Sequence, residues 1–369
     1  MTMPEYTALV ASLPSTVPFV GPETQERARG RAFRARIGAN ESVFGPSLKA
    51  IAAMAKAAAE CWQYADPVNY DLKHALAAHH GVKPENIMVG EGIDGILGLL
   101  VRMLVQQNTP VVTSLGAYPT FNFHVSGFGG KLVTVPYKDD FEDPQALVSA
   151  VLDHNAPLAY FANPDNPMAS FHPAETIQKL IGDMSRNSLL CLDEAYCEFA
   201  PEGSLLPIDV DEERVVRTRT FSKAYGMAGA RVGYAIGHRD LIDSFNKVRN
   251  HFGVNRIAQA GALAALADQQ WLNDVVARVH AANAAIAEIA TQNGLVPLPS
   301  ATNFVTIDCG SDGEFAKRVV AELVARDVFV RMPFVEPGNR CIRISAGQPA
   351  DIELVKEMLP QALKSARNA

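Results

Sequence analysis

Short apolar segments alternate with longer amphipathic segments through the first 250 residues of the chain. The apolar segments have the length of β-strands and stand at residues 87–89, 110–114, 132–135, 158–161, 189–192, 214–217 and 232–236. Helices are predicted between and before them at residues 6–13, 48–59, 70–80, 118–126, 143–151 and 175–184. Ser47 is placed to cap the helix at 48–59, and Gly81 to end the helix at 70–80. Apolar strands that alternate with helices are typical of an α/β fold with a mainly parallel sheet.

The pattern changes after about residue 250. Helices are predicted at residues 255–267, 271–289, 314–326 and 350–366, and strands at 303–307, 328–331 and 341–345. This arrangement indicates a smaller α+β region. We therefore predict a large domain at residues 41–250 and a small domain made of residues 1–40 and 251–369.

The charge and hydropathy of the chain argue against nucleic-acid and membrane partners. Its 369 residues include 33 Lys and Arg against 40 Asp and Glu, so the formal net charge is −7 and there is no general basic field. The longest apolar stretch, residues 93–105, contains Asp94 and Arg102 and is too short to span a bilayer. No basic segment followed by an apolar core begins the chain, so we expect no signal peptide and a cytoplasmic location.

The cysteines are odd in number and widely scattered, at Cys61, Cys191, Cys197, Cys309 and Cys341. None of them forms a CxxC pair or a zinc-ligand spacing, so no metal site is predicted. The simplest explanation of this number and spacing is that the cysteines are packed free thiols in a reducing compartment.

Ligands of a parallel sheet bind beyond the carboxyl ends of its strands, so the residues that follow each strand are the candidates for function. The glycine-rich turn at residues 90–95 opens a helix, and the N–H groups of Gly92 and Ile93 can bind an anion there. Such turns are also common without a ligand. Tyr118 follows the next strand, where its ring can lie flat on a planar cofactor or simply pack under the turn.

Polar residues also follow the strands at 158–161 and 189–192. Two Asn-Pro steps at residues 163–167 enforce a rigid loop, which can aim the amide of Asn166 at a ligand oxygen or serve only as a turn. Asp193 ends a fully apolar strand, where a carboxylate is costly unless it is partnered. Its natural partner is a protonated ring nitrogen or another cation, and Tyr196 can reach the same ligand.

Lys223 is flanked by small and hydroxyl residues rather than by other charges. Thr220 and Ser222 precede it, and Arg231 follows before the strand at 232–236. A desolvated lysine has a lowered pKa, which frees its amine to form a Schiff base with a carbonyl. The two hydroxyls and the arginine can hold a phosphate. Taken alone, such a lysine is more often an ordinary surface residue.

Arg343 interrupts the apolar strand at 341–345. A partly buried arginine seeks a carboxylate, and a bidentate pair with the α-carboxylate of a substrate fits this position. A structural salt bridge to an internal Asp or Glu is the competing interpretation.

The ordered set of these motifs resembles one family. It runs GEGID at 90–94, Tyr118, NPDNP at 163–167, DEAY at 193–196, TFSK at 220–223, Arg231 and CIRIS at 341–345. This order is similar to that of the fold-type I enzymes that use pyridoxal phosphate (PLP), namely the class I and II aminotransferases and, among them, the histidinol-phosphate aminotransferase-like group. The resemblance covers the chain from about residue 37 to its C-terminus. It implies an aspartate aminotransferase-like fold, with PLP bound by the large domain.

The resemblance also implies a role for each candidate residue. Lys223 would form the Schiff base with PLP and move the proton between the substrate and the cofactor, and Asp193 would keep the ring nitrogen protonated. Arg343 would bind the substrate carboxylate. The other implied cofactor contacts are Asn166 and Tyr196 on the phenolic oxygen, Tyr118 on the ring face, and Gly92, Ile93, Thr220, Ser222 and Arg231 on the phosphate.

Two further segments resemble parts of the same family. Residues 62–67 are similar to the segment whose tyrosine, here Tyr64, reaches the phosphate of the partner subunit. This similarity implies a homodimer with a shared active site. Asn40 lies in a segment that resembles the family's Asn-Glu-Asn-Pro loop near the substrate.

Three motifs depart from the common family pattern. The chain reads Asn166-Pro-Met-Ala where Asn-Pro-Thr-Gly is common, Gly92-Ile-Asp-Gly for Gly-Ser-Asp-Glu, and Ser42-Val43 for Asn-Pro. None of these changes removes the lysine or an acid–base residue, so an active enzyme is expected.

The implied reaction moves an amino group between a 2-oxo acid and an L-amino acid or histidinol phosphate. No motif marks a site for a substrate phosphate, although Arg256, Arg331 and Arg340 are available. The alternatives are a PLP-dependent decarboxylase or lyase of the same fold and a non-catalytic binding module.

Overall fold

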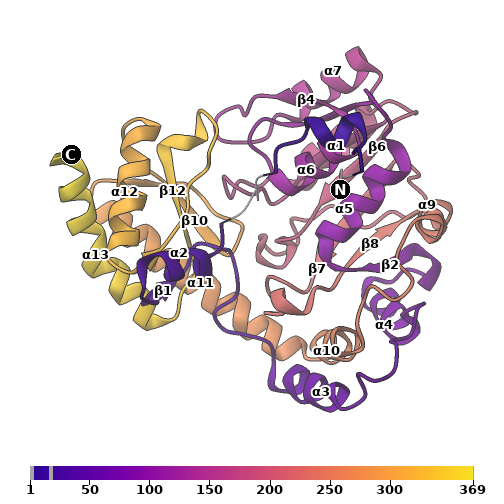
Figure 1. The fold of residues 1–369 in the computed structure, drawn as a ribbon, viewed down its shortest axis with the longest axis horizontal. Helices are drawn as coiled ribbons and strands as arrows, with labels where there is room; N and C mark the ends of the chain where they lie inside the picture. Colours follow the sequence, from indigo (N-terminus) through magenta and orange to yellow (C-terminus); the bar gives the residue numbers. More distant parts are fainter. Residues whose placement is uncertain (1–3, 16–19, 369) are drawn as a thin grey trace.

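The computed structural model describes residues 4–15 and 20–368, and a seven-stranded sheet forms the centre of its larger part (Figure 1). In spatial order its strands are β2 (Ile87–Gly90), β8 (Gly233–Gly237), β7 (Val215–Thr220), β6 (Leu189–Asp193), β5 (Leu158–Ala162), β3 (Pro110–Ser114) and β4 (Lys131–Val135). β8 is antiparallel to both of its neighbours, and the other strands run parallel to one another. The prediction of an α/β fold with a mainly parallel sheet is confirmed.

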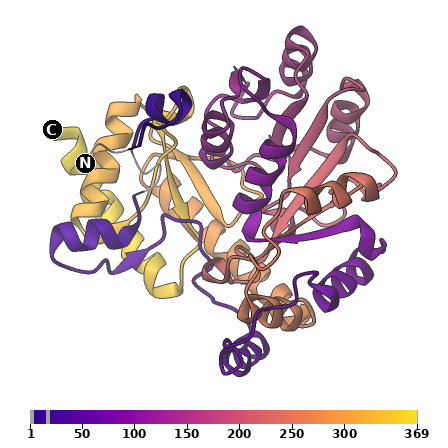
Figure 2. The same cartoon turned by 45° about the vertical axis from the view of Figure 1, so that its right-hand side comes forward.

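Helices cover both faces of this sheet (Figures 1 and 2). One face packs against α5 (Gly92–Leu104), α6 (Pro119–Gly127) and α9 (Arg239–Ser244). The other face packs against α7 (Pro144–His154), α8 (Ala174–Asp183), α4 (Tyr70–His80), α10 (Arg256–Leu266) and the first half of α11 (Gln269–Gln292). Apart from the edge strand β4, the strands are buried on both faces, which is why most of them read as continuous apolar segments.

A second group of elements lies beside the first and, apart from the indigo β1, is orange to yellow in Figure 1. Its antiparallel sheet has the order β12 (Cys341–Ser345), β10 (Phe304–Asp308) and β9 (Val296–Pro297), and β1 (Ala35–Arg36) pairs in parallel with β11 (Val328–Phe329). Helices α12 (Gly313–Ala325), α13 (Pro349–Asn368) and the second half of α11 pack around these strands and share a hydrophobic cluster of their own with them.

The remaining elements are short helices at the N-terminal side and single 3-10 turns. They are α1 (Ala8–Ser12), α2 (Pro22–Arg29), α3 (Leu48–Ala58), η1 (Pro84–Asn86), η2 (Cys197–Phe199), η3 (Ala228–Ala230), η4 (Phe245–Lys247) and η5 (Gly338–Arg340). The predicted caps are confirmed, since Ser47 Oγ accepts from the N–H of Ala50 at 3.1 Å and Gly81 ends α4 with φ 66°. α2 was not predicted. Its sequence is strongly polar, and it is stabilised by tertiary ion pairs such as that of Arg29 with Asp327.

Strand β7 runs further than the sequence predicted, from Val215 to Thr220 instead of ending at residue 217. Two arginines, Arg217 and Arg219, break its apolar pattern but are almost completely buried. Both pair with Glu194, at 3.3 and 2.8 Å. A buried charge is tolerated only with such a partner. Glu194 follows β6, so the local sequence of β7 could not reveal that its arginines are paired and buried.

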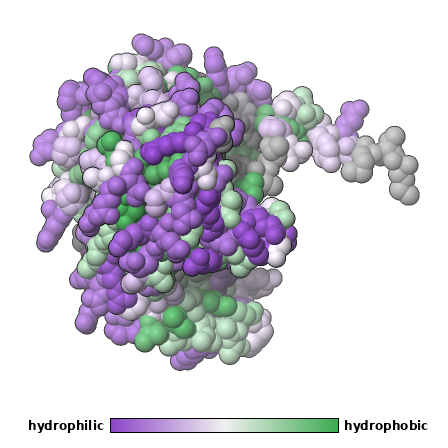
Figure 3. Space-filling model, turned by 90° about the vertical axis from the view of Figure 1, so that its left-hand side faces the viewer, coloured by the Kyte–Doolittle hydropathy of each residue, from purple (hydrophilic) through white to green (hydrophobic). Residues whose placement is uncertain are grey.

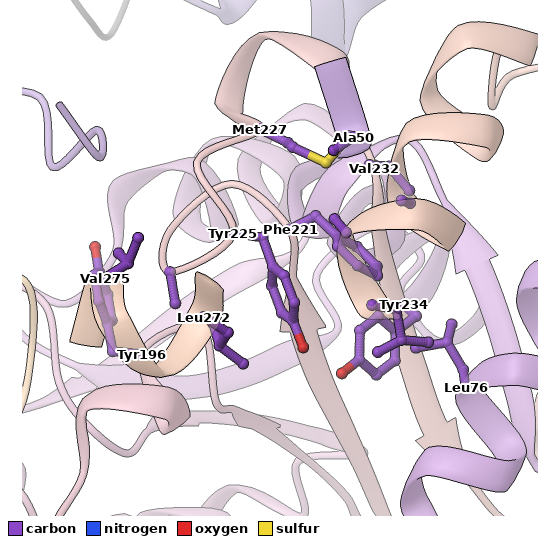
Figure 4. Packing of buried hydrophobic residues seen from close by; sticks show 14 of the residues in the cluster. Ala50, Leu76, Tyr196, Phe221, Tyr225, Met227, Val232, Tyr234, Leu272 and Val275 are labelled. Carbon is purple, nitrogen blue, oxygen red and sulfur yellow. The ribbon is translucent and has the colours of Figure 1, made fainter. Parts of the chain in front are cut away.

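A cluster of large side chains packs under the turn that carries Lys223 (Figure 4). The ring of Phe221 lies 4.8 Å from that of Tyr225 and 5.8 Å from that of Tyr234, measured between centroids. Phe221 is fully buried, so it anchors the main chain close to Lys223. Within residues 4–15 and 20–368, no helix combines the length and the apolar character needed to cross a membrane.

Candidate active site

A cavity of about 420 Å³ lies between the carboxyl ends of the parallel strands and strand β12. Eleven of the predicted site residues line it: Asn40, Ile93, Tyr118, Asn166, Asp193, Tyr196, Thr220, Ser222, Lys223, Arg231 and Arg343. They come from segments far apart in the sequence, and they meet because parallel strands end at the same edge of a sheet.

The amine of Lys223 is held by main-chain and aromatic groups. Its Nζ donates a hydrogen bond to the main-chain oxygen of Asn40 at 3.2 Å and lies 5.4 Å from the centre of the Tyr196 ring. The turn that carries Lys223 requires a glycine at position 226. Gly226 has φ 70°, and a Cβ there would lie 2.3 Å from the main chain of Gly45. Among the described residues no carboxylate pairs with this amine, an arrangement that suits a Schiff-base lysine.

Asp193 is the last residue of β6 and is buried. Its Oδ2 accepts a hydrogen bond from the hydroxyl of Tyr160 at 2.7 Å, and its Oδ1 accepts one from the N–H of Ala195 at 3.0 Å. Burial raises the pKa of this carboxyl to about 6. Both donors are neutral, so a cation that enters the cavity would compensate the buried negative charge. A protonated ring nitrogen is such a cation.

Arg343 donates a hydrogen bond from NH1 to Oδ1 of Asn166. The guanidinium is buried, and burial lowers its pKa to about 10. Its Nε has no hydrogen-bond partner among the described residues, and none of their carboxylates lies within salt-bridge distance of it. The internal ion pairs belong instead to Arg340, which contacts Asp140 at 2.8 Å and Asp308 at 2.7 Å. The geometry thus favours binding of an external carboxylate over a structural salt bridge.

Asn40 connects the lysine with the tyrosine of the site. Its Nδ2 donates to the hydroxyl of Tyr196 at 3.0 Å, and its Oδ1 accepts from Oγ of Ser345 at 3.1 Å. The main-chain oxygen that binds Lys223 also accepts from the amide of Asn303 at 3.0 Å. Asn40 has φ 56°, a conformation in which Asn is enriched among the residues other than glycine.

An anion-binding arrangement stands at the start of α5. Gly92 has φ 75°, and a Cβ there would lie 2.4 Å from NH2 of Arg231. The free N–H groups at this helix N-terminus and the guanidinium of Arg231 can therefore bind one anion together. Oδ2 of Asp94 lies 3.4 Å from NH2 of Arg231, so Asp94 would compete with a bound anion for this guanidinium. Oδ1 of Asp94 accepts a hydrogen bond from the hydroxyl of Tyr118 at 2.7 Å. The Tyr118 ring is thereby held at the cavity wall.

Thr220 and Ser222 are buried beside Lys223. Oγ1 of Thr220 accepts from the N–H of Ser222 at 3.0 Å, which stabilises the turn that leads to the lysine. Both residues line the cavity, as their predicted contact with a phosphate requires.

Tyr64 lies away from this cavity within its own chain. It is 78% exposed, and its ring centroid is 4.6 Å from that of Phe252. Its main-chain oxygen accepts from Arg256 at 2.7 Å, so this arginine is also outside the cavity.

Sequence reasoning missed three residues that contact the site, namely Tyr160, Asn303 and Ser345, and it named Arg331 only as an available cation. Tyr160 and Ser345 could have been found from the alternation of side chains along their strands. Tyr160 shares a face of β5 with Ala162, and Ser345 shares a face of β12 with Arg343. No comparable local signal marks Asn303 or Arg331. They reach the site through the register of β10 and β12 and through the pairing of Arg331 with Arg343.

Comparison with known proteins agrees with this geometry. The family model for aminotransferases of class I and II matches residues 36–359. The chain is 33% identical over 375 residues to histidinol-phosphate aminotransferase 2 of Ralstonia nicotianae, covering 99% of this chain and 98% of that protein. It is 33% identical over 339 residues to histidinol-phosphate aminotransferase 1 of Mesorhizobium japonicum, covering 89% and 90% of the two chains.

Solved structures extend the comparison to three dimensions. The crystal structure of histidinol-phosphate aminotransferase from Sinorhizobium meliloti in complex with pyridoxal-5′-phosphate is 52% identical, with a TM-score of 0.96 over 99% of both chains. Aspartate aminotransferase from Thermus thermophilus with maleate, 21% identical, shares the fold with a TM-score of 0.82 over 98% of this chain and 100% of that one. The chain therefore belongs to the aminotransferases of class I and II.

Proposed function

We propose that this chain is a PLP-dependent aminotransferase that exchanges an amino group between a 2-oxo acid and histidinol phosphate or an L-amino acid. Membership of the family supports the reaction type, and the similar Sinorhizobium meliloti structure supports the cofactor. The observation that carries the proposal is that the amine of Lys223 and the buried carboxylate of Asp193 share one cavity with an anion-binding helix N-terminus.

The residues of the cavity fit PLP at three points. The amine of Lys223 can react with an aldehyde, and the carboxylate of Asp193 can pair with a protonated pyridine nitrogen. At the start of α5, the absence of a Cβ on Gly92 lets the main chain approach the guanidinium of Arg231, where the phosphate would bind. Thr220 and Ser222 add hydroxyl groups beside this position.

When bound, PLP withdraws electrons from the Cα–H bond of an attached amine, and the protein supplies the proton transfer and the binding. We assign Lys223 to the bond with the cofactor aldehyde and to the movement of the proton at the substrate Cα. Asp193 would keep the ring nitrogen protonated. Tyr196 and Asn166 would bind the phenolic oxygen, and Tyr118 would lie against the ring.

Two arginines that pair through an isolated β-bridge, Arg331 and Arg343, favour substrates with two acidic groups, or with a phosphate. The N–H of Arg343 donates to the oxygen of Arg331 at 2.6 Å, and the N–H of Arg331 donates to the oxygen of Arg343 at 3.3 Å. Residues directly opposite each other place their side chains on the same face, and both of these line the cavity. We assign Arg343 to the substrate α-carboxylate. We assign Arg331 to the second anionic group, which is the distal carboxylate of a 2-oxo diacid or the phosphate of histidinol phosphate.

Exposed apolar side chains support a homodimer. Trp62, Tyr64 and Leu48 are 83%, 78% and 78% exposed. Figure 3 shows hydrophobic residues gathered at the lower end of the molecule, at the level of α3 in Figure 1, below a mostly hydrophilic face. Large exposed apolar surfaces are typical of protein–protein interfaces. We assign this surface to a second copy of the chain, with Tyr64 reaching the phosphate site of that copy.

The domain division and the location are also part of the proposal. We propose a large PLP-binding domain at residues 41–250 and a small domain made of residues 1–40 and 251–369, with α10 packing on the large domain where the chain passes between them. Residues 1–3, 16–19 and 369 of the small domain lie outside the described residues. The five cysteines are free, four of them buried, which supports a reducing compartment such as the cytoplasm.

A panel of amino donors tests the proposal. Purified protein loaded with PLP is mixed with histidinol phosphate, glutamate, aspartate or an aromatic amino acid, and the visible spectrum is followed. We expect conversion of bound PLP to pyridoxamine phosphate with histidinol phosphate and with glutamate. Release of carbon dioxide without this conversion would favour the decarboxylase alternative. No spectral change with any donor would contradict the catalytic assignment.

A further inference from the structure

Ser345 is a buried side chain that the proposed reaction does not use. It is the last residue of β12 and is 1% exposed. It does not line the active-site cavity, although Asn40 beside it does. A serine hydroxyl carries one proton and two lone pairs, so the group that takes this proton decides what the neighbouring side chains can donate.

The hydroxyl of Ser345 has two hydrogen bonds, both with Asn40. Its Oγ accepts from the main-chain N–H of Asn40 at 3.1 Å. The same Oγ donates to Oδ1 of Asn40 at 3.1 Å. Among the described residues this hydroxyl has no third partner, so its one proton is committed to the amide oxygen of Asn40.

The opposite orientation of the Asn40 amide leaves a proton without an acceptor. Turning the amide by half a rotation exchanges Oδ1 and Nδ2. Oγ of Ser345 would then face two N–H donors, and its own proton would lose the acceptor that it has. Asn40 is 3% exposed, so water does not replace this acceptor, and an unpaired buried donor is costly. The amide oxygen therefore faces Ser345, and Nδ2 faces Tyr196.

This orientation leaves Tyr196 as a donor. Nδ2 of Asn40 donates to the hydroxyl oxygen of Tyr196 at 3.0 Å, and an amide nitrogen does not accept, so the proton of Tyr196 has to go elsewhere. No residue that the structure describes accepts it, and Tyr196 lines the cavity although it is only 3% exposed. The ring is held edge-on by Phe304, with centroids 5.6 Å apart. This buried hydroxyl therefore requires an acceptor atom from a ligand.

Asn166 is turned in the same sense by another residue of β12. The guanidinium of Arg343 only donates, and its NH1 binds Oδ1 of Asn166, so Nδ2 of Asn166 is left to donate. Asn166 lines the same cavity as Tyr196. Arg343 and Ser345 stand two positions apart and share one face of β12. One face of this strand thus leaves two donors available to the cavity.

We propose that Ser345 is a positioning residue which, through Asn40, commits the hydroxyl of Tyr196 to donating a hydrogen bond to an oxygen of the ligand. The proposal rests on the proposed function, in which this atom is the phenolic oxygen of PLP. Tyr196 and Asn166 then offer this oxygen two donors and no acceptor, which favours its ionised form. Ser345 influences the charge state of the ligand without touching it.

Ligand binding to the cofactor-free, full-length chain tests the proposal. Pyridoxamine 5′-phosphate carries the phenolic oxygen, and its 3-deoxy analogue lacks it. In Ser345→Ala the amide of Asn40 is free to turn and to accept the proton of Tyr196. The affinity for pyridoxamine phosphate should therefore fall roughly fivefold to thirtyfold, while that for the analogue should stay within about twofold. Equal losses for the two ligands, or no loss, would overturn the proposal.

Two further variants separate the hydroxyl of Ser345 from a general loss of packing. Ser188→Ala is the matched control, because Ser188 is also buried and donates to the main-chain oxygen of Ala156 at 2.6 Å, away from the cavity. It should leave the ratio of the two affinities unchanged. Ser345→Thr keeps the hydroxyl and should restore the wild-type ratio. The ratio of Ser345→Ala in this variant would contradict the role of the hydroxyl.

A double-mutant cycle tests whether the effect passes through Tyr196. In Tyr196→Phe the ratio should no longer respond to Ser345→Ala, and a full response there would exclude this route. If Ser345→Ala does not fold, Asn40→Asp takes its place, because a carboxylate of the same shape only accepts hydrogen bonds. Its ratio should fall in wild type more than in Tyr196→Phe, where only the added charge acts. An equal fall in both backgrounds would overturn the proposal.

Failure of this inference is distinct from failure of the proposed function, since the affinities are measured without turnover. Wild type that bound neither ligand would overturn the cofactor assignment and this inference with it. Wild type that bound pyridoxamine phosphate, with a ratio that Ser345→Ala left unchanged, would overturn only the role of Ser345.

Discussion

The amine of Lys223 and the main-chain oxygen of Asn40 are joined by a hydrogen bond of 3.2 Å. The same asparagine donates its amide to the hydroxyl of Tyr196 at 3.0 Å. One residue from near the start of the chain therefore orients two of the groups assigned to catalysis. Ser345 on β12 donates a hydrogen bond to the side chain of Asn40, so this residue links β12 to the turn after β7 that carries Lys223.

Replacing Lys223 with alanine should abolish the reaction while leaving the fold intact. The amine forms no ion pair with the described residues, so little stability depends on it. Removal of a group that acts as both acid and base should lower kcat about 10²–10⁴-fold, and loss of the covalent link should lower it further. Single-turnover kinetics with glutamate measure this effect, and full activity of Lys223→Ala would contradict the assignment.

Two substitutions of Asn40 distinguish the contribution of its side-chain amide from that of its backbone conformation. Asn40→Gly and Asn40→Ala both remove the hydrogen bond to Tyr196, so both should lower kcat by about fivefold, equivalent to a bond of about 1 kcal/mol. Because Asn40 has φ 56°, alanine should in addition cost about 1–2 kcal/mol of stability that glycine does not. Chemical denaturation and initial rates measure the two effects. Equal stability of the two variants would show that the backbone is not strained.

Removing the hydroxyl of Tyr160 should weaken PLP binding in a pH-dependent way. This hydroxyl lowers the pKa of Asp193, which burial has raised from 3.8 to about 6, so Tyr160→Phe should raise it further. Asp193 must be ionised to pair with a protonated ring nitrogen. The acid limb of PLP affinity should therefore shift to higher pH, with a loss of about 1.5–3 kcal/mol for a hydrogen bond to a charged group. Fluorescence titration of PLP across pH measures this shift, and an unmoved limb would exclude the coupling.

The raised pKa of Asp193 should also make the stability of the cofactor-free protein depend on pH. Because the folded pKa of Asp193 lies above its unfolded value of 3.8, the stabilisation is complete at lower pH and is lost as the pH rises through about 6. Asp193→Asn should remove this part of the pH dependence.

Alanine at position 92 should weaken phosphate binding through a steric effect. Its Cβ would lie 2.4 Å from NH2 of Arg231, and φ is 75° there, so the variant should lose about 1–2 kcal/mol of stability and bind PLP less tightly. Gly182→Ala in α8 is the matched control, because nothing lies within 4 Å of its Cβ and its backbone is helical. This control should gain about 0.5–1 kcal/mol. Similar behaviour of the two variants would contradict the steric argument.

The two arginines of the cavity should differ in the substrates that they affect. Arg331→Gln should raise the KM for histidinol phosphate by at least tenfold, as expected for a lost charged hydrogen bond of about 1.5–3 kcal/mol, and spare monocarboxylic 2-oxo acids. Arg343→Gln should impair every 2-oxo acid. Separate half-reactions with each substrate give the comparison. If Arg331→Gln affected all substrates equally, its assignment to the second anion would be wrong.

Much of the candidate site could be predicted because each motif follows a strand of one parallel sheet. Gly92, Tyr118, Asn166, Asp193 and Lys223 stand at or after the carboxyl ends of β2, β3, β5, β6 and β7, and parallel strands bring such residues to one edge. The helix α2 and the full length of β7 could not be predicted. Their polar residues are stabilised by ion pairs with distant segments, such as Glu194 for β7.

The sequence by itself determined the class of fold, the strands of its central sheet and the residue types at their ends. Burial on two faces requires apolar strands, so these strands can be found from the sequence. A lysine without neighbouring charges, or an acid at the end of an apolar strand, can also be found from the local sequence. Only the tertiary structure decided which of these groups touch. The bond of Tyr160 to Asp193 and the pairing of Arg331 with Arg343 depend on strand register and loop closure. Those are set by packing between segments that are distant in the chain.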